Sequence, residues 1–143
     1  MGERYVRDFM TAPPESLSQD ASLLDAALTF HSTGFRHLPV VDGNRLVGII
    51  SEGDVQRLSP SLISKVSQEE YNAVLRNTIL KQVMTRDPLT VAPETHLLEA
   101  AAILKDRKVG CLPVVQDGNL IGIITVVDML GALLLLLDGA RRE

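Results

Sequence analysis

The chain has 143 residues, 45% of them hydrophobic and 22% charged, which is the composition of a globular domain and argues against a disordered chain. Its 14 Lys and Arg against 18 Asp and Glu give a net charge of −4, so no basic field favours a nucleic-acid partner. The single cysteine, Cys111, excludes an intramolecular disulfide and favours a reducing, cytoplasmic setting. Residues 1–10 carry charges of both signs and do not resemble a signal peptide, and no apolar run is long enough to cross a membrane.

An internal duplication organises the chain. A shift of 74 positions aligns residues 10–54 with residues 84–128 without a gap, and sixteen of these 45 positions are identical. Because a unit of about 45 to 60 residues buries little surface on its own, we expect the two copies to pack on each other about a pseudo-two-fold axis. The predicted division is repeat 1 over residues 1–58, a helical insertion over 59–82 and repeat 2 over 83–143.

Each copy is predicted to begin with a short extended segment and a helix. The extended segments are expected around Leu17 and Val91. Leucines and alanines then recur at helical spacing over residues 23–34 and again over residues 97–104. The first half of each copy is therefore predicted to form a strand followed by a helix.

A hairpin and a second helix are predicted to complete each copy. Apolar runs on either side of a short turn containing Gly43, or Asp117 and Gly118, are typical of two antiparallel strands. Each hairpin ends in a hydroxyl residue that is followed three positions later by an aspartate, a pattern typical of a helix start. The resulting β-α-β-β-α order places the chain in the mixed α/β (α+β) class.

Two further helices are predicted from apolar spacing. In the connector, Ser67 and Glu70 form a capping-box pattern before apolar residues at helical spacing, which indicates a helix rather than a flexible linker. Residues 129–137 are almost wholly apolar, which is more than one buried helix face requires. We therefore expect part of this run to pack against another chain, and we predict a homodimer.

The duplicated residues resemble those of a known family. Two copies of a Pro-Val-Val strand, a short turn, a Gly-Ile-Ile strand and Ser/Thr-x-x-Asp, each preceded by Met-Thr and an alanine-rich helix, resemble the cystathionine-β-synthase (CBS) domain. A tandem pair of these domains is a Bateman module, and the resemblance covers about residues 6–137. It implies β-α-β-β-α repeats, two clefts between them, and an adenosine-containing ligand such as AMP, ADP, ATP or S-adenosylmethionine.

The Ser/Thr-x-x-Asp pattern has two interpretations. An ionised Asp is purely an acceptor and can take both hydroxyl donors of a ribose cis-diol, while free amides at a helix start favour a nearby phosphate. The same residues also serve as an ordinary helix cap, with the Asp favourable to the helix dipole. Recurrence at matching positions favours binding, and both interpretations stay open.

The resemblance implies that the Asp of one repeat works with residues of the other repeat. The first cleft would combine Ile123, Thr125 and Asp128 with Thr11, Ser16, Phe35, Arg36 and His37, and the second would combine Ile49, Ser51 and Asp54 with Thr85, Thr90, Val109 and Gly110.

The two predicted clefts differ in charge. Arg36 and His37 can offer guanidinium and imidazolium donors to phosphate oxygens, whereas Gly110 and Cys111 at the matching positions offer no cation. We expect the first cleft to hold the phosphorylated nucleotide, and the second to be empty, weak or filled by an adenosine moiety. The alternative is that Arg36 solvates a loop and His37 packs beside the hairpin.

No catalytic or metal-binding set stands out. Cys111 lies in an apolar run and is expected to be a small buried hydrophobe, and the isolated His31 and His96 have no metal-ligand spacing. No nucleophile–base pair or phosphate-cradling glycine loop indicates an enzyme or a catalytic cofactor. The leading hypothesis is a regulatory module that signals nucleotide binding to an effector protein in trans. The alternative is a structural association module with non-binding clefts.

Overall fold

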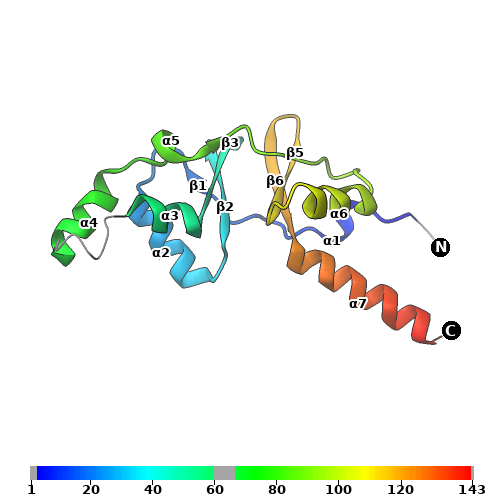
Figure 1. Cartoon of the computed structure of the whole chain (residues 1–143). Coiled ribbons are helices and arrows are strands. Elements are labelled where there is room, and N and C mark those ends of the chain that lie inside the picture. The colour runs from blue at the N-terminus through cyan, green and yellow to red at the C-terminus, as the bar shows by residue number, and fades with distance from the viewer. Residues whose placement is uncertain (1–2, 60–66, 143) are drawn as a thin grey trace. The chain divides into compact units, whose positions relative to one another are not determined.

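The computed structural model describes residues 3–59 and 67–142, and it confirms the mixed α/β class. The chain forms two compact units (Figure 1). We call Glu15–Pro88 the first-repeat unit, and Met1–Pro14 together with Leu89–Glu143 the second-repeat unit. The segment that precedes each repeat in the chain therefore belongs to the unit of the other repeat, which the alignment of the two copies does not reveal.

The first-repeat unit contains the predicted β-α-β-β-α order, followed by the connector helices and a short strand. Its elements are β1 (Leu17–Ser18), α2 (Leu23–Thr33), β2 (His37–Asp42), β3 (Arg45–Ser51), α3 (Glu52–Leu58), α4 (Gln68–Asn77), α5 (Leu80–Val83) and β4 (Thr85–Arg86). Strand β2 pairs with β1 in parallel and with β3 in antiparallel orientation, and β3 pairs with β4. Residues 60–66 of the predicted insertion lie outside the described residues.

The second-repeat unit repeats this plan with a reduced first strand. Its elements are α1 (Val6–Phe9), α6 (Leu97–Asp106), β5 (Cys111–Gln116), β6 (Asn119–Thr125) and α7 (Val126–Arg142). The predicted extended segment around Val91 consists of a single parallel bridge to Val114 on β5. None of the helices within residues 3–59 and 67–142 is long and apolar enough to span a bilayer.

Local sequence explains how these elements start and turn. Ser22 and Asp25 form a reciprocal capping box at the start of α2, and Gly34 ends that helix with a φ of +76°. Both hairpins close as predicted. Asp117 and Gly118 both have positive φ, as a type I′ turn requires, and these tight turns fix which face of each hairpin is buried.

Each unit has its own apolar core under its hairpin. Leu23, Leu38 and Ile50 are fully buried in the first-repeat unit, and Leu112 and Ile124 take the corresponding places in the second. The connector helix α4 packs on the first of these cores. Its cap is Ser67, as the capping-box pattern predicts, and its Leu75 is buried. The end of each hairpin, where the hydroxyl-x-x-Asp residues lie, is thereby held on a rigid base.

Candidate functional site

In both units a Met-Thr segment lies against the middle of the second hairpin strand. Thr85 on β4 pairs with Ile49 on β3, and the amide of Thr11 donates to the carbonyl of Ile123 at 2.8 Å. A glycine makes each approach possible. A Cβ atom on Gly48 would lie 2.8 Å from the carbonyl oxygen of Thr85, which is closer than real Cβ contacts come.

The matching glycine in the second-repeat unit is Gly122. A Cβ atom there would lie 2.6 Å from the sulfur of Met10 and 3.2 Å from the Thr11 carbonyl oxygen. The Gly-Ile-Ile and Met-Thr motifs recur together because each is the packing partner of the other. This packing brings the Thr11 hydroxyl to Asp128, and it pairs Thr85 with Ile49, two residues before Ser51.

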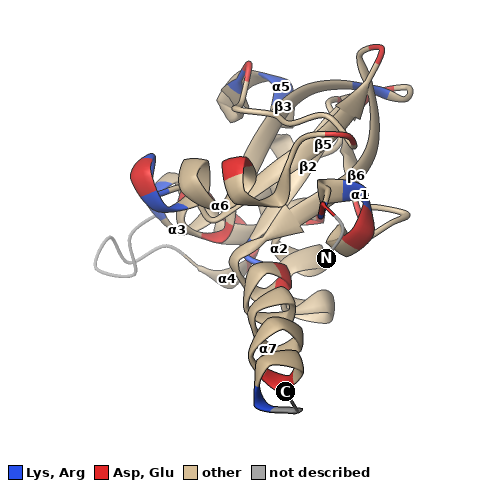
Figure 2. Ribbon diagram, turned by 90° about the vertical axis from the view of Figure 1, so that its right-hand side faces the viewer, with Lys and Arg blue, Asp and Glu red and all other residues tan. Residues whose placement is uncertain are grey.

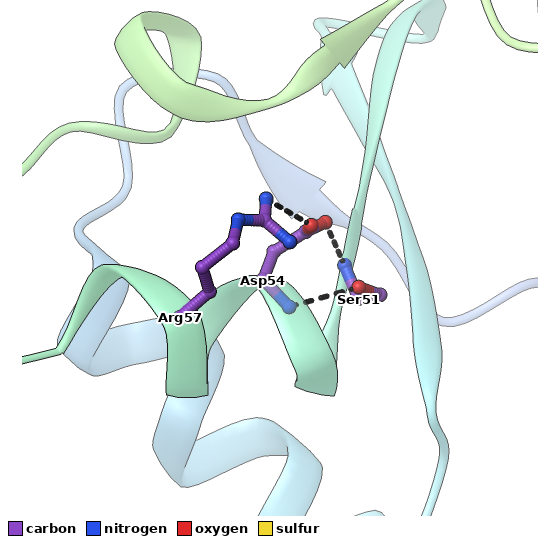
Figure 3. A network of polar contacts seen from close by, with 3 residues as sticks. All are labelled: Ser51, Asp54 and Arg57. Atoms are coloured by element: carbon purple, nitrogen blue, oxygen red, sulfur yellow. Dashed lines mark hydrogen bonds and ion pairs between the residues drawn. The ribbon is translucent and has the colours of Figure 1, made fainter.

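The Asp54 carboxylate closes the capping box of α3 and is also held by an arginine (Figure 3). One oxygen, Oδ2, accepts the Ser51 amide at 2.9 Å, and the Ser51 hydroxyl in turn accepts the Asp54 amide at 3.0 Å. The other oxygen, Oδ1, accepts Arg57 Nη2 at 2.7 Å. Burial of this carboxyl raises its pKa, but the bonds from Ser51 and Arg57 outweigh that effect and hold the pKa of Asp54 below its ordinary value.

The Asp128 carboxylate caps α7 in the same way but has a different second partner. Its Oδ2 accepts the amide of Thr125 at 2.9 Å and the Thr125 hydroxyl at 3.1 Å. Its Oδ1 accepts the hydroxyl of Thr11 at 3.1 Å, across 117 positions of sequence. Among the residues that the structure describes, the Asp oxygen that faces away from the cap accepts a single hydrogen bond in each unit, so it has acceptor capacity for a further donor.

Arg57 is the residue of this site that the sequence analysis missed. The signal was present, because Asp54 and Arg57 are three positions apart on one helix and can therefore pair. The position 74 residues later is Gly131, so the second copy has no equivalent cation. Within the described part of the chain, no Lys, Arg or His side chain bonds to Asp128.

Arg36 and His37 lie beside the motif of their own repeat. The carbonyl of Arg36 accepts the amide of Glu52 at 2.9 Å, and His37 on β2 is opposite Ser51 on β3. Burial lowers the pKa of His37 and the nearby Arg36 lowers it further, against an opposing effect of Asp54. The lowered pKa favours the neutral ring over the imidazolium that the sequence analysis considers. A neutral imidazole still donates through one nitrogen.

The structure brings together part of each predicted cleft. Thr11, Ile123, Thr125 and Asp128 meet in the second-repeat unit, and Ile49, Ser51, Asp54 and Thr85 meet in the first-repeat unit. The remaining predicted residues are divided between the units, with Ser16, Phe35, Arg36 and His37 in the first-repeat unit and Thr90, Val109 and Gly110 in the second. That these sets complete one another stays a prediction.

The surroundings of Cys111 keep its thiol protonated. Its side chain is buried as predicted, and burial raises the pKa of the thiol to about 12, so the thiol stays protonated at neutral pH. Across residues 3–59 and 67–142, no three His, Cys, Asp or Glu side chains are grouped so that they could hold a metal ion. The contacts that the two aspartates make are hydrogen bonds from amide and hydroxyl groups, together with the Arg57 ion pair in one motif.

Comparison with known proteins identifies a family and several similar folds. The family model of the CBS domain matches residues 6–61 and 80–135. The chain is 33% identical to AcuB from Vibrio cholerae, a proposed acetoin utilization protein, with a TM-score of 0.83 over 99% of this chain and 98% of that one.

Of two further relatives, one has about the length of this chain and the other is much longer. The chain is 30% identical to the CBS-pair protein CBSX2 from Arabidopsis thaliana, with a TM-score of 0.83 over 96% of this chain and 99% of that one. A structure of CBSX2 in complex with AMP matches at 31% identity and a TM-score of 0.77, over 93% and 98% of the two chains. The chain is also 34% identical to part of the inosine-5′-monophosphate dehydrogenase of Korarchaeum cryptofilum, where the match covers 87% of this chain but only 22% of that enzyme.

Proposed function

Since this chain belongs to the CBS domain family, which it matches twice, we propose that it is a regulatory module that binds an adenosine-containing ligand and signals ligand binding to a partner protein. The observation that carries this proposal is the repeated aspartate. In each unit an Asp is fixed by its own helix cap and keeps acceptor capacity on its outer oxygen, beside a second polar side chain. The AMP complex of CBSX2 supports AMP as a ligand to test first.

The proposed chemistry is recognition of a ribose. Asp54 and Asp128 accept one ribose hydroxyl at the remaining acceptor position of the outer oxygen, and the second hydroxyl when Arg57 or Thr11 releases that oxygen. The capping bonds from Ser51 and Thr125 keep each carboxylate oriented before the ligand arrives. The predicted cleft residues of the partner repeat supply the adenine and phosphate contacts. AMP, ADP, ATP and S-adenosylmethionine are the proposed ligands.

A ligand panel tests this function. We expect AMP, ADP, ATP or S-adenosylmethionine to raise the Tm of the purified protein in a thermal-shift measurement, whereas guanosine monophosphate has little effect. A ligand at 100 times its Kd stabilises the folded state by about 2.7 kcal/mol, which is easily measured. A flat response to the whole panel would contradict ligand binding and would favour the alternative of a structural association module.

We also propose that a second copy of the chain covers the apolar face of α7. Between Asp128 and Asp138 this helix has no charged residue, as Figure 2 shows. Its exposed leucines continue into a groove of about 580 Å³, which α7 and α6 line with Ala101, Leu98, Met129, Leu133 and Leu136. Exposed apolar surface of this extent is typical of an interaction face.

The oligomeric state tests this interface. Leu135 is 65% exposed, and Leu135→Glu is expected to convert a dimer to a monomer because it places a charge on the apolar face. Val74→Glu is the matched control, since Val74 is an exposed apolar residue of α4 and should leave the mass unchanged. Light scattering at micromolar concentration measures both variants. A monomeric parent protein would refute the interface.

A further inference from the structure

The cationic side chains near the two aspartates are distributed unequally. Arg57 bonds directly to Asp54, and Arg36 lies near the same motif, where its charge acts on His37. In the second copy, Arg57 aligns with Gly131, Arg36 with Gly110 and His37 with Cys111. Glu52, which aligns with Val126, adds one negative charge to the first-repeat motif. The motif of Asp54 is thus close to neutral and rich in donors, whereas among the described residues no cationic side chain bonds to Asp128.

Arg57 is able to take a second partner. Its side chain is 68% exposed, and within the described residues its guanidinium makes one hydrogen bond, to Asp54. A guanidinium has five N–H donors in a planar fork that suits two oxygens of a phosphate. Because an ion pair with an exposed arginine is weak, the guanidinium can exchange the carboxylate for a phosphate oxygen at little cost.

Asp128 offers the opposite environment. The partner of its outer oxygen is the neutral hydroxyl of Thr11. A ligand bound there meets hydroxyl and amide donors and one negative charge, which repels a phosphate and attracts a cation. The open helix surface at Gly131, where an added Cβ atom would meet nothing within 4 Å, leaves room for a side chain that the sequence does not supply.

We propose that Arg57 sets the ligand class of the first-repeat motif. The Asp54 motif takes a phosphorylated adenosine, and the Asp128 motif takes an adenosine derivative without a phosphate, either neutral or carrying a sulfonium. This inference rests on the proposed function. It differs from the expectation that the phosphorylated nucleotide accompanies Asp128, and one set of variants distinguishes the two.

Calorimetric titration with AMP and with adenosine tests the proposal, since these ligands differ only in the 5′-phosphate. Asp128→Asn leaves the Asp54 motif as the main site, and we expect it to bind AMP at least ten-fold more tightly than adenosine. Adding Arg57→Gln should lower the AMP affinity about ten-fold, as loss of a charge-assisted hydrogen bond does, and change the adenosine affinity less than three-fold. Arg57→Lys, which keeps the charge, should retain most of the preference.

The reciprocal variants test the other motif. In Asp54→Asn with Arg57→Gln, we expect adenosine to bind at least as tightly as AMP. Adding Gly131→Arg should then raise the AMP affinity about ten-fold, whereas Gly131→Gln, of similar length and no charge, should not. Circular dichroism melting confirms that each variant is folded.

The outcomes separate this inference from the proposed function. If the parent protein binds neither AMP nor adenosine, the proposed function fails, and the inference fails with it. If it binds them but Arg57→Gln leaves the ratio of the two affinities unchanged, only the role of Arg57 is overturned. A stronger preference for AMP at the Asp128 motif would also overturn it and would support the expectation based on Arg36 and His37.

Discussion

The double variant Asp54→Asn with Asp128→Asn is expected to lose at least 100-fold in affinity for both AMP and adenosine. Each aspartate is proposed to accept two ribose hydroxyl groups, and a hydrogen bond to a charged group contributes about 1.5 to 3 kcal/mol. An asparagine keeps an oxygen of the same shape for the helix cap but loses the charge and one acceptor. Calorimetric titration measures the loss, and the Tm without ligand measures the effect on folding.

The chain offers a matched control for this double variant. Asp25 forms the same reciprocal capping box with Ser22 at the start of α2, with bonds of 2.9 and 3.1 Å, and it belongs to neither proposed motif. Asp25→Asn should change the Tm by an amount comparable to either single variant and leave both affinities unchanged. If Asp25→Asn weakens binding as much as Asp128→Asn does, the aspartates act only as helix caps.

The elements of this fold were predictable from the sequence because their signals are local. Spacing predicts α2 and α6, the Asp117-Gly118 pair between two apolar runs predicts a hairpin, and Ser67 predicts the start of α4. The exchange of the Met-Thr segments between units was expected only from the family resemblance, which places Thr11 with Asp128 and Thr85 with Asp54, and it does not follow from the residues themselves. Both copies have the same Met-Thr and Gly-Ile-Ile residues, so the sequence alone does not say which segment packs on which strand.

The two aspartates of the candidate site were predictable from the sequence, but the protonation of His37 and the role of Arg57 were not. Asp54 and Asp128 stand out because they recur with their hydroxyl partners at the same shift. The protonation state of His37 depends on how far burial removes the ring from water, and burial is a property of the folded unit. Arg57 has no counterpart in the second copy, so a search guided by repetition passes over it. The residues that distinguish the two motifs are those the duplication does not preserve.

Gly48→Ala is expected to lower the free energy of unfolding by about 1 to 3 kcal/mol, the usual cost of overpacking a well-filled site. The added methyl carbon would lie 2.5 Å from the sulfur of Met84 and 2.8 Å from the carbonyl oxygen of Thr85. The thioether is flexible and can turn away. The carbonyl is part of the β3–β4 pairing and can move only if β4 separates from β3. Urea denaturation measures the change.

Alanine substitutions at two other glycines serve as comparisons for Gly48→Ala. Gly122→Ala should cost less than Gly48→Ala, because its nearest backbone atom, the Thr11 carbonyl oxygen, lies 3.2 Å from the new carbon and needs to give way by only a few tenths of an ångström. Gly131→Ala should stabilise by up to about 1 kcal/mol, since it replaces a glycine on the open surface of α7 with a good helix former. Equal effects of Gly48→Ala and Gly122→Ala would show that backbone contact does not decide the cost. A Gly48→Ala protein as stable as its parent would mean that the Met-Thr segment does not lie against β3 in solution.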